Sequence, residues 1–133
     1  MRYVCLIYDD EKKLAGMPAD EAQAFMGEYF QYTEGLRGSG HYIAGEALQP
    51  IQSATSLRSR NGKLSTTDGP FAETKEQLGG FYLIEARDLN EALQIASRIP
   101  SVRTGTIEVR PVVDFSQQQE PPRAGRETTG ATA

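Results

Sequence analysis

A chain of 133 residues with a net charge of −4 is long enough for one domain with a hydrophobic core and too short for two. Its 38% hydrophobic and 24% charged residues are typical of a globular protein. The acidic balance argues against nucleic-acid binding, which requires a basic surface to neutralise phosphates. Cys5 is the single cysteine, so the chain forms no internal disulfide, and an unpaired thiol favours the reducing cytoplasm.

The chain begins with an apolar strand. Residues Tyr3 to Tyr8 are rich in β-branched and aromatic side chains, and their lack of alternation predicts burial on both faces. Asp9 and Asp10 end this run, which is too short for a signal peptide or a membrane span. We therefore expect a cytoplasmic protein that does not contact a membrane.

A helix and a second strand follow. Pro18 suits a first helical turn, and the apolar residues after it recur at helical spacing until Gly38 and Gly40 end the helix. Residues His41 to Leu48 form the second predicted strand.

A hairpin is predicted next. Two short strands, at about Thr55–Ser59 and Lys63–Thr67, are joined by Asn61-Gly62. Asn-Gly favours a type I′ turn, because both central residues of that turn need a positive φ.

The second half repeats the order strand, helix, strand. Phe81 to Ala86 reads as an apolar strand, and Asp88 with Glu91 forms a capping box for a helix that Pro100 ends. The buried face of this helix is predicted to contain Leu89, Ala92, Leu93, Ala96 and Ile99. Thr106 to Val113 supplies the last strand, where Pro111 implies an edge position or a bulge.

The composition changes after Phe115. Residues 116–133 contain no aromatic residue and no aliphatic residue larger than alanine, so they cannot bury enough surface to offset the entropy of ordering. We predict a folded domain over residues 1–115 and a disordered tail over 116–133.

The order of elements predicts an α+β fold. Strand, helix, strand, hairpin, strand, helix, strand is a ferredoxin-like split βαβ pattern with a hairpin inserted in the middle. Two helices cover only one face of such a sheet, whereas its strands look apolar on both faces. A second copy of the same sheet is the simplest cover, so the sequence predicts a homodimer.

One segment resembles a known family. It consists of Thr67-Asp68-Gly69-Pro70-Phe71-Ala72-Glu73-Thr74-Lys75-Glu76 followed by Gly79-Gly80-Phe81-Tyr82-Leu83-Ile84, and similar residues occur at 45–50 and 108–111. These residues resemble the signature of the DGPF proteins, a branch of the YCII-related domain family. The resemblance covers residues 1 to about 115. It implies a dimeric α+β barrel, and it implies a genetic link to extracytoplasmic-function sigma factors.

The sequence departs from that family at the proposed catalytic dyad. Other YCII-related proteins carry a His in the first helix and an Asp near the end of the second. Here the first helix contains no His, and residues 96–100 contain no Asp. An acid/base role that depends on the dyad therefore does not transfer.

Two carboxylates are the candidates for acid/base catalysis. Glu46 shares strand parity with Tyr42, Ala44 and Leu48, so it is expected to point into apolar surroundings, with Lys75 or Arg110 as a cationic partner. The alternative role for Glu46 is a structural ion pair. Asp68 opens an irregular polar segment that is typical of a cavity mouth or, alternatively, of a plain turn.

The remaining candidates are ligand-binding residues. They are His41, Phe71, Glu73, Lys75, Glu76 and Arg110. Phe71 is predicted to anchor its segment in the core or in the dimer interface. The sequence shows no metal-ligand cluster and no phosphate-binding loop, so we expect neither a metal nor an organic cofactor.

Two functions fit these observations. The first is a homodimeric α+β barrel that binds a small organic molecule in a pocket of each subunit, with carboxylate acid/base chemistry. The second is a regulatory module of a sigma-factor system that catalyses no reaction.

Overall fold

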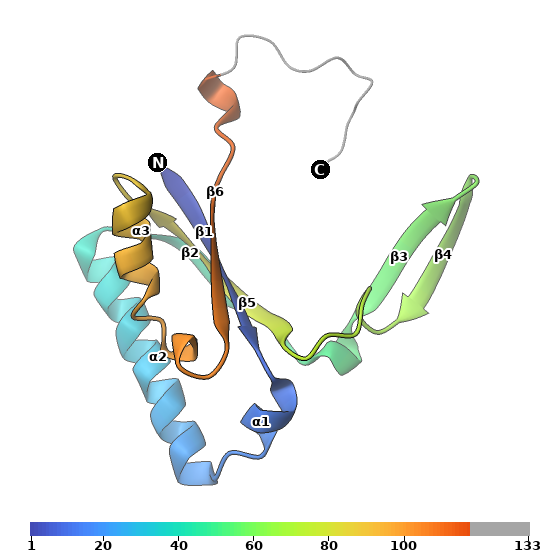
Figure 1. The fold of residues 1–133 in the computed structure, drawn as a ribbon, viewed down its shortest axis with the longest axis horizontal. Coiled ribbons are helices and arrows are strands. Elements are labelled where there is room, and N and C mark those ends of the chain that lie inside the picture. Colours follow the sequence, from blue (N-terminus) through green and yellow to red (C-terminus); the bar gives the residue numbers. More distant parts are fainter. Residues whose placement is uncertain (118–133) are drawn as a thin grey trace.

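The computed structural model describes residues 1–117 and has a single four-stranded sheet as its centre (Figure 1). The predicted tail lies almost entirely outside the described residues. The helices and strands, in chain order, are β1 (Arg2–Asp9), α1 (Glu11–Ala15), α2 (Ala19–Ser39), β2 (Tyr42–Ala47), β3 (Thr55–Arg60), β4 (Lys63–Asp68), β5 (Gln77–Glu85), α3 (Leu89–Ala96) and β6 (Thr106–Pro111). Three short 3₁₀ turns complete the chain: η1 (Ile51–Ser53), η2 (Pro100–Val102) and η3 (Phe115–Gln117).

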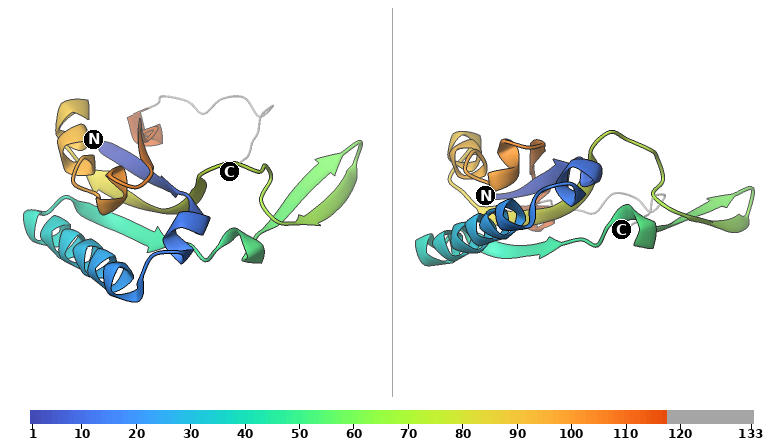
Figure 2. Two further views of the ribbon diagram at one scale, coloured as in Figure 1. Left: turned by 60° about the horizontal axis from the view of Figure 1, so that its bottom comes forward. Right: turned by 90° about the horizontal axis from the view of Figure 1, so that it is seen from below.

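The sheet has the predicted ferredoxin-like order. Its strands run β2-β5-β1-β6, and all neighbouring pairs are antiparallel. β6 is an edge strand, which confirms the position expected for Pro111. The two long helices lie against the same face of the sheet (Figure 2). The fold class is therefore the α+β arrangement predicted from the sequence.

The core lies between this face and the helices. β1 alternates strictly, so that Tyr3, Cys5 and Ile7 are buried against the helices while the residues between them are half-buried. This corrects the expectation that β1 is buried on both faces. Burial raises the pKa of the Cys5 thiol to about 11.

The opposite face of the sheet, here called the open face, carries the half-buried residues that alternate with the buried ones. Val4 pairs with Leu83, and Leu6 pairs with both Phe81 and Glu108. These side chains are half-buried, and neither α2 nor α3 packs on them.

α3 differs from its predicted buried face. Its buried side chains are Ala92, Ile95 and Ala96, whereas Leu89 and Leu93 are each 47% exposed. The helix is oriented so that these three side chains, and not the two leucines, are buried. Asp88 caps the helix by accepting from the Glu91 N–H (2.9 Å), as predicted. The Glu91 carboxylate, however, accepts from the N–H of Arg87 (2.8 Å) rather than from that of Asp88.

The hairpin of β3 and β4 forms a separate two-stranded sheet that extends away from the body (Figures 1 and 2). Asn61 (φ 53°) and Gly62 (φ 76°) have the positive φ values predicted for the turn.

Two elements differ from the sequence prediction. α1 was not predicted; the carboxylate of Asp10 caps it by accepting from the N–H groups of Lys12 and Lys13. β5 begins at Gln77, so Gly79 and Gly80 lie inside the strand. A Cβ at Gly80 would lie 2.7 Å from the carbonyl oxygen of Glu46, so glycine allows β2 and β5 to approach closely.

No helix among residues 1–117 is long and apolar enough to cross a membrane.

Candidate functional site

A cavity of about 840 Å³ lies between α1, the sheet and one side of α2. Its volume is in the range of small-molecule binding sites. α1 and the first turns of α2 lie at the same end of the sheet as the end of β1 (Figure 1). The apolar side chains that line the cavity include those of Ile7, Leu14, Met17, Phe25, Met26 and Phe30. Met26 and Phe30 are 68% and 70% exposed, so α2 presents large apolar side chains that nothing in residues 1–117 covers.

A chain of hydroxyl groups leads from the cavity to a buried carboxylate. Asp9, at the end of β1, is only 6% exposed, and its carboxylate accepts from Ser101 Oγ at 2.5 Å and from Thr104 Oγ1 at 2.7 Å. Tyr29 on α2 donates its phenol proton to Ser101 Oγ at 2.6 Å. Asp9, Ser101 and Tyr29 all line the cavity. Asp9 makes no ion pair within the described part of the chain.

The backbone holds Asp9 tightly. Gly105 passes directly over the end of β1, and a Cβ at this position would overlap the carbonyl oxygen of Tyr8 and lie 2.6 Å from Asp9 Oδ1. The turn that follows η2 therefore closes over the carboxylate, and only glycine fits there.

A second pair of hydroxyls lies beside the first. Tyr82 Oη on β5 is 2.6 Å from Thr33 Oγ1, and Thr33 Oγ1 donates to the carbonyl oxygen of Tyr29 at 3.0 Å. Gly45 makes room for the Tyr82 ring, because a Cβ there would lie 2.9 Å from it. Tyr82, Thr33 and Gly45 also line the cavity.

Burial favours the neutral form of Tyr29 and Tyr82. Desolvation raises the pKa of Tyr29 to about 12 and also raises the pKa of Tyr82. At neutral pH these phenols are therefore hydrogen-bonding groups rather than bases.

The other end of the cavity carries a cation. The Arg37 guanidinium lies 4.2 Å from the centre of the Tyr42 ring, and its Nε atom is 3.8 Å from a Glu34 carboxylate oxygen. All three residues line the cavity, which thus has the buried Asp9 carboxylate at one end and the Arg37–Glu34 ion pair at the other.

Glu46 is the only predicted site residue that borders this cavity. It is exposed, and it pairs across the sheet with Phe81, whose side chain lies on the open face. The predicted parity with Tyr42 fails because the register shifts between Tyr42 and Ala44. Arg110, one of its two expected partners, instead pairs with Glu108 at 2.8 Å. That cation holds the pKa of Glu108 below its usual range.

The first part of the signature, Thr67 to Glu76, lies away from the cavity, whereas Gly79 to Tyr82 of its second part border it. Asp68 is the exposed last residue of β4, and Phe71 is 79% exposed, so Phe71 does not anchor the segment in the core of the subunit. Of the polar group that follows, Glu73 and Lys75 are exposed, whereas Glu76 accepts from Thr106 Oγ1 at 2.8 Å. The structure therefore separates these residues from the cavity.

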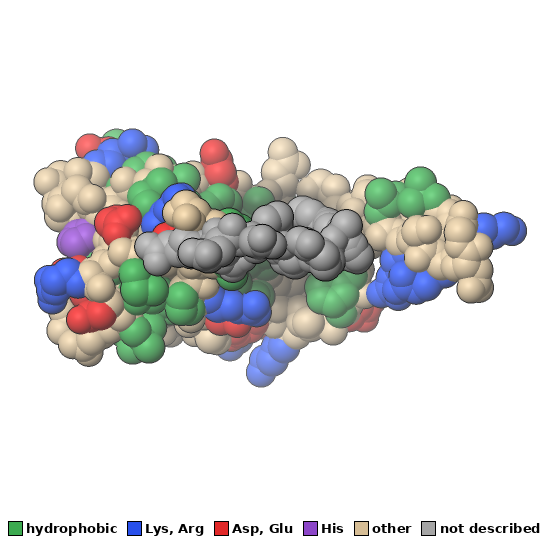
Figure 3. All heavy atoms as spheres, turned by 90° about the horizontal axis from the view of Figure 1, so that it is seen from above, with side chains coloured by type: hydrophobic (Ala, Val, Ile, Leu, Met, Phe, Trp, Pro, Cys, Tyr) green, Lys and Arg blue, Asp and Glu red, His purple; other side chains and the backbone are tan. Residues whose placement is uncertain are grey.

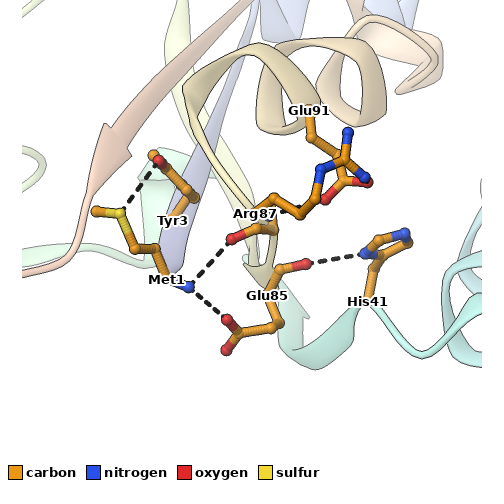
Figure 4. A network of polar contacts seen from close by, with 7 residues as sticks. Met1, Tyr3, His41, Glu85, Arg87 and Glu91 are labelled. Atoms are coloured by element: carbon orange, nitrogen blue, oxygen red, sulfur yellow. Dashed lines mark hydrogen bonds and ion pairs between the residues drawn. The ribbon is translucent and has the colours of Figure 1, made fainter.

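His41 lies at the end of the sheet where the chain begins. Its Nδ1 is 2.9 Å from the carbonyl oxygen of Glu85, whose carboxylate binds the N-terminal amine of Met1 at 2.5 Å (Figure 4). These contacts tie β2 and the N-terminus to the end of β5. His41 does not border the cavity.

The hairpin forms a second feature of the surface. Leu57 and Leu64 are 61% and 69% exposed, and Arg58, Arg60 and Lys63 lie on the same two strands. Figure 3 shows Lys and Arg side chains gathered at this end of the molecule beside hydrophobic ones.

Sequence reasoning missed the polar residues of the cavity. In the sequence, Asp9 only marks the end of an apolar run, and Ser101 and Thr104 fall in a connection with no motif. The available signal was the pair Tyr29 and Thr33, one helical turn apart on the apolar face of α2. Within residues 1–117, His, Cys, Asp and Glu form no group of three that could hold a metal ion.

The comparisons with known proteins agree with this fold. The profile of the YCII-related domain matches residues 1–116. An uncharacterized protein of Rhizobium meliloti is 35% identical over 123 residues, which cover 91% of this chain and 99% of that protein. Among solved structures, 5-chloro-2-hydroxyhydroquinone dehydrochlorinase from Burkholderia phenoliruptrix, in complex with 2,5-dihydroxybenzoquinone, matches with a TM-score of 0.50. That match covers 85% of this chain and 94% of the other at 15% identity, which shows a shared fold.

Proposed function

The chain belongs to the YCII-related domain family, and we propose that it binds a small, largely apolar organic molecule in the cavity beside α2. The observation that carries this proposal is the cavity itself. It combines apolar walls with a few convergent polar groups, which is the usual composition of a ligand site.

The exposed apolar side chains of α2 support the same proposal. Met26 and Phe30 border the cavity, yet each remains more than two-thirds exposed. A bound apolar molecule would remove part of this surface from water, and each square ångström of apolar area buried contributes about 25 cal/mol.

The proposed assembly is a homodimer formed through the open face. Val4, Leu6, Phe81 and Leu83 form an apolar patch there that the helices of the same subunit do not cover. A second copy would bury this patch sheet to sheet. Light scattering at micromolar concentration should report twice the subunit mass, and a monomer would rule out this assembly.

Acid/base chemistry in the cavity would fall to Asp9, the carboxylate buried among its polar groups. The earlier candidates Glu46 and Asp68 stay predictions, to be tested by Glu46→Gln and Asp68→Asn.

A cytoplasmic location also stays a proposal, and the buried, unpaired Cys5 is compatible with it.

A matched pair of variants tests the binding proposal. Ala22 borders the cavity, whereas Ala24, two residues along the same helix, is exposed and does not border it. After a screen of ring compounds by ligand-observed NMR, with 2,5-dihydroxybenzoquinone included, Ala22→Phe should weaken every hit by at least about tenfold, whereas Ala24→Phe should leave affinity unchanged.

Equal affinities of the two variants for the compounds would mean that the ligand binds outside the cavity. If no compound binds, a pull-down with a sigma factor encoded in the gene neighbourhood would test the regulatory alternative. No contact among residues 1–117 favours that alternative over the small-molecule binding function.

A further inference from the structure

We infer that the Asp9 end of the cavity favours ligand hydroxyl groups over anionic groups, and that Tyr29 and Tyr82 accept hydrogen bonds from these hydroxyls. This inference deepens the proposed function and rests on it. Its basis is the direction in which each hydroxyl of the cavity donates.

The direction of the first chain follows from its buried end. An ionised carboxylate only accepts hydrogen bonds, so the Ser101 hydroxyl must donate to Asp9. Ser101 Oγ is then free to accept, and the Tyr29 phenol donates to it at 2.6 Å. The Tyr29 proton is therefore directed away from the cavity, and its Oη atom presents an acceptor to the cavity.

The second chain has the same direction. The Thr33 hydroxyl donates to the carbonyl oxygen of Tyr29, which has no proton to give. In the 2.6 Å contact between Thr33 Oγ1 and Tyr82 Oη, Tyr82 must then be the donor. Tyr82 Oη is thus a second acceptor beside the first, and both residues border the cavity.

The charge of Asp9 strengthens this preference. The carboxylate is buried and lacks an ion pair within residues 1–117, so it disfavours a second negative charge nearby. Successive donors that point toward an anion also polarise one another, which makes the last oxygen of the chain a better acceptor. The cavity wall near Asp9 therefore favours a ligand hydroxyl over a carboxylate or a phosphate.

The ligand class that fits is a hydroxylated ring compound. Apolar side chains such as Ile7 and Phe25 surround the ring, while two acceptors receive its hydroxyl protons. A methyl ether of the same ring would fit the apolar part and leave both acceptors unpaired, which costs affinity.

The experiment compares hydroquinone with 1,4-dimethoxybenzene by NMR titration of the intact protein. Wild type should prefer hydroquinone by about tenfold, the effect of one net hydrogen bond. Tyr29→Phe should reduce the preference severalfold, because it removes one acceptor. Ser101→Ala should reduce it less, since it leaves the Tyr29 oxygen in place but breaks the chain to Asp9.

Tyr32→Phe is the matched control. Tyr32 lies on the same helix, donates to the carbonyl oxygen of Ile95 at 2.7 Å and does not border the cavity. Removal of its hydroxyl group should leave the preference for hydroquinone over 1,4-dimethoxybenzene at the wild-type value.

The outcomes separate the two proposals. If neither probe binds the wild type, both the binding function and this inference fail. If both probes bind equally, or if Tyr29→Phe and Ser101→Ala keep the full preference, the cavity binds ring compounds without selecting hydroxyl groups, and only this inference is overturned.

Discussion

The four-stranded sheet and the β3–β4 hairpin are both antiparallel, yet their side chains have opposite environments. β1 and β5 alternate between buried and half-buried residues, whereas nearly every residue of β3 and β4 is exposed. The sheet is stabilised by apolar burial, and the hairpin by its turn and its cross-strand hydrogen bonds. An isolated two-stranded hairpin is at best marginally stable in water, so we expect the hairpin to be the less stable of the two regions in the subunit alone.

The first prediction measures the difference between these regions. Ile84 is completely buried in β5, and Leu64 is 69% exposed in β4. Ile84→Ala should lower the free energy of unfolding by about 2–5 kcal/mol, because it leaves a cavity in the core. Leu64→Ala should change it by less than about 0.5 kcal/mol in the isolated subunit. Urea denaturation measures both values, and equal losses would show that the hairpin is part of the core.

The second prediction uses pH to perturb a partly buried tyrosine that packs against the core between the sheet and the helices. All six tyrosines lie outside the hairpin, and burial raises the pKa of Tyr29 from 10.0 in an unfolded chain to about 12. A group whose pKa is raised by folding contributes stability below pH 10, and this stability is lost as the pH rises toward 12, because the unfolded chain ionises first. The melting temperature should therefore fall between these pH values.

Tyr29→Phe serves as the control for that pH dependence. It removes the titrating group, so its melting temperature should fall less steeply between pH 10 and pH 12 than that of the wild type. An identical slope in both proteins would mean that Tyr29 does not contribute.

The sequence predicts those features that depend on local geometry. The Asn61-Gly62 turn and the Asp88 cap each follow from residues that are close together in the chain. The sequence does not predict features that depend on contacts between residues far apart in the chain. Leu89 and Leu93 fit a helical stripe, but the sheet packs against Ala92 and Ile95 instead.

The site is harder to predict for the same reason. Asp9 and Ser101 are 92 residues apart in the sequence, and only the packing of η2 against the end of β1 brings them together. For Glu46, a single register shift in β2 reverses the predicted face. The signature identifies the family, yet residues 69–76 lie on the connection that leads out of the hairpin, and only Gly79 to Tyr82 of its second part border the cavity.

The last prediction concerns Phe71, which follows the hairpin and is 79% exposed. As a core anchor it would cost about 3–5 kcal/mol when truncated, but an exposed side chain has no core contacts to lose. In dilute protein, Phe71→Ala should therefore change the free energy of unfolding by less than about 0.5 kcal/mol. If Phe71 instead packs against a second copy, as the exposed leucines of the hairpin also suggest, the variant should weaken dimerisation, and its melting temperature should depend more strongly on protein concentration than that of the wild type. Sedimentation equilibrium of both proteins measures the dimer dissociation constant directly. An unchanged constant would leave Phe71 without a structural role and make it available for a partner other than this chain.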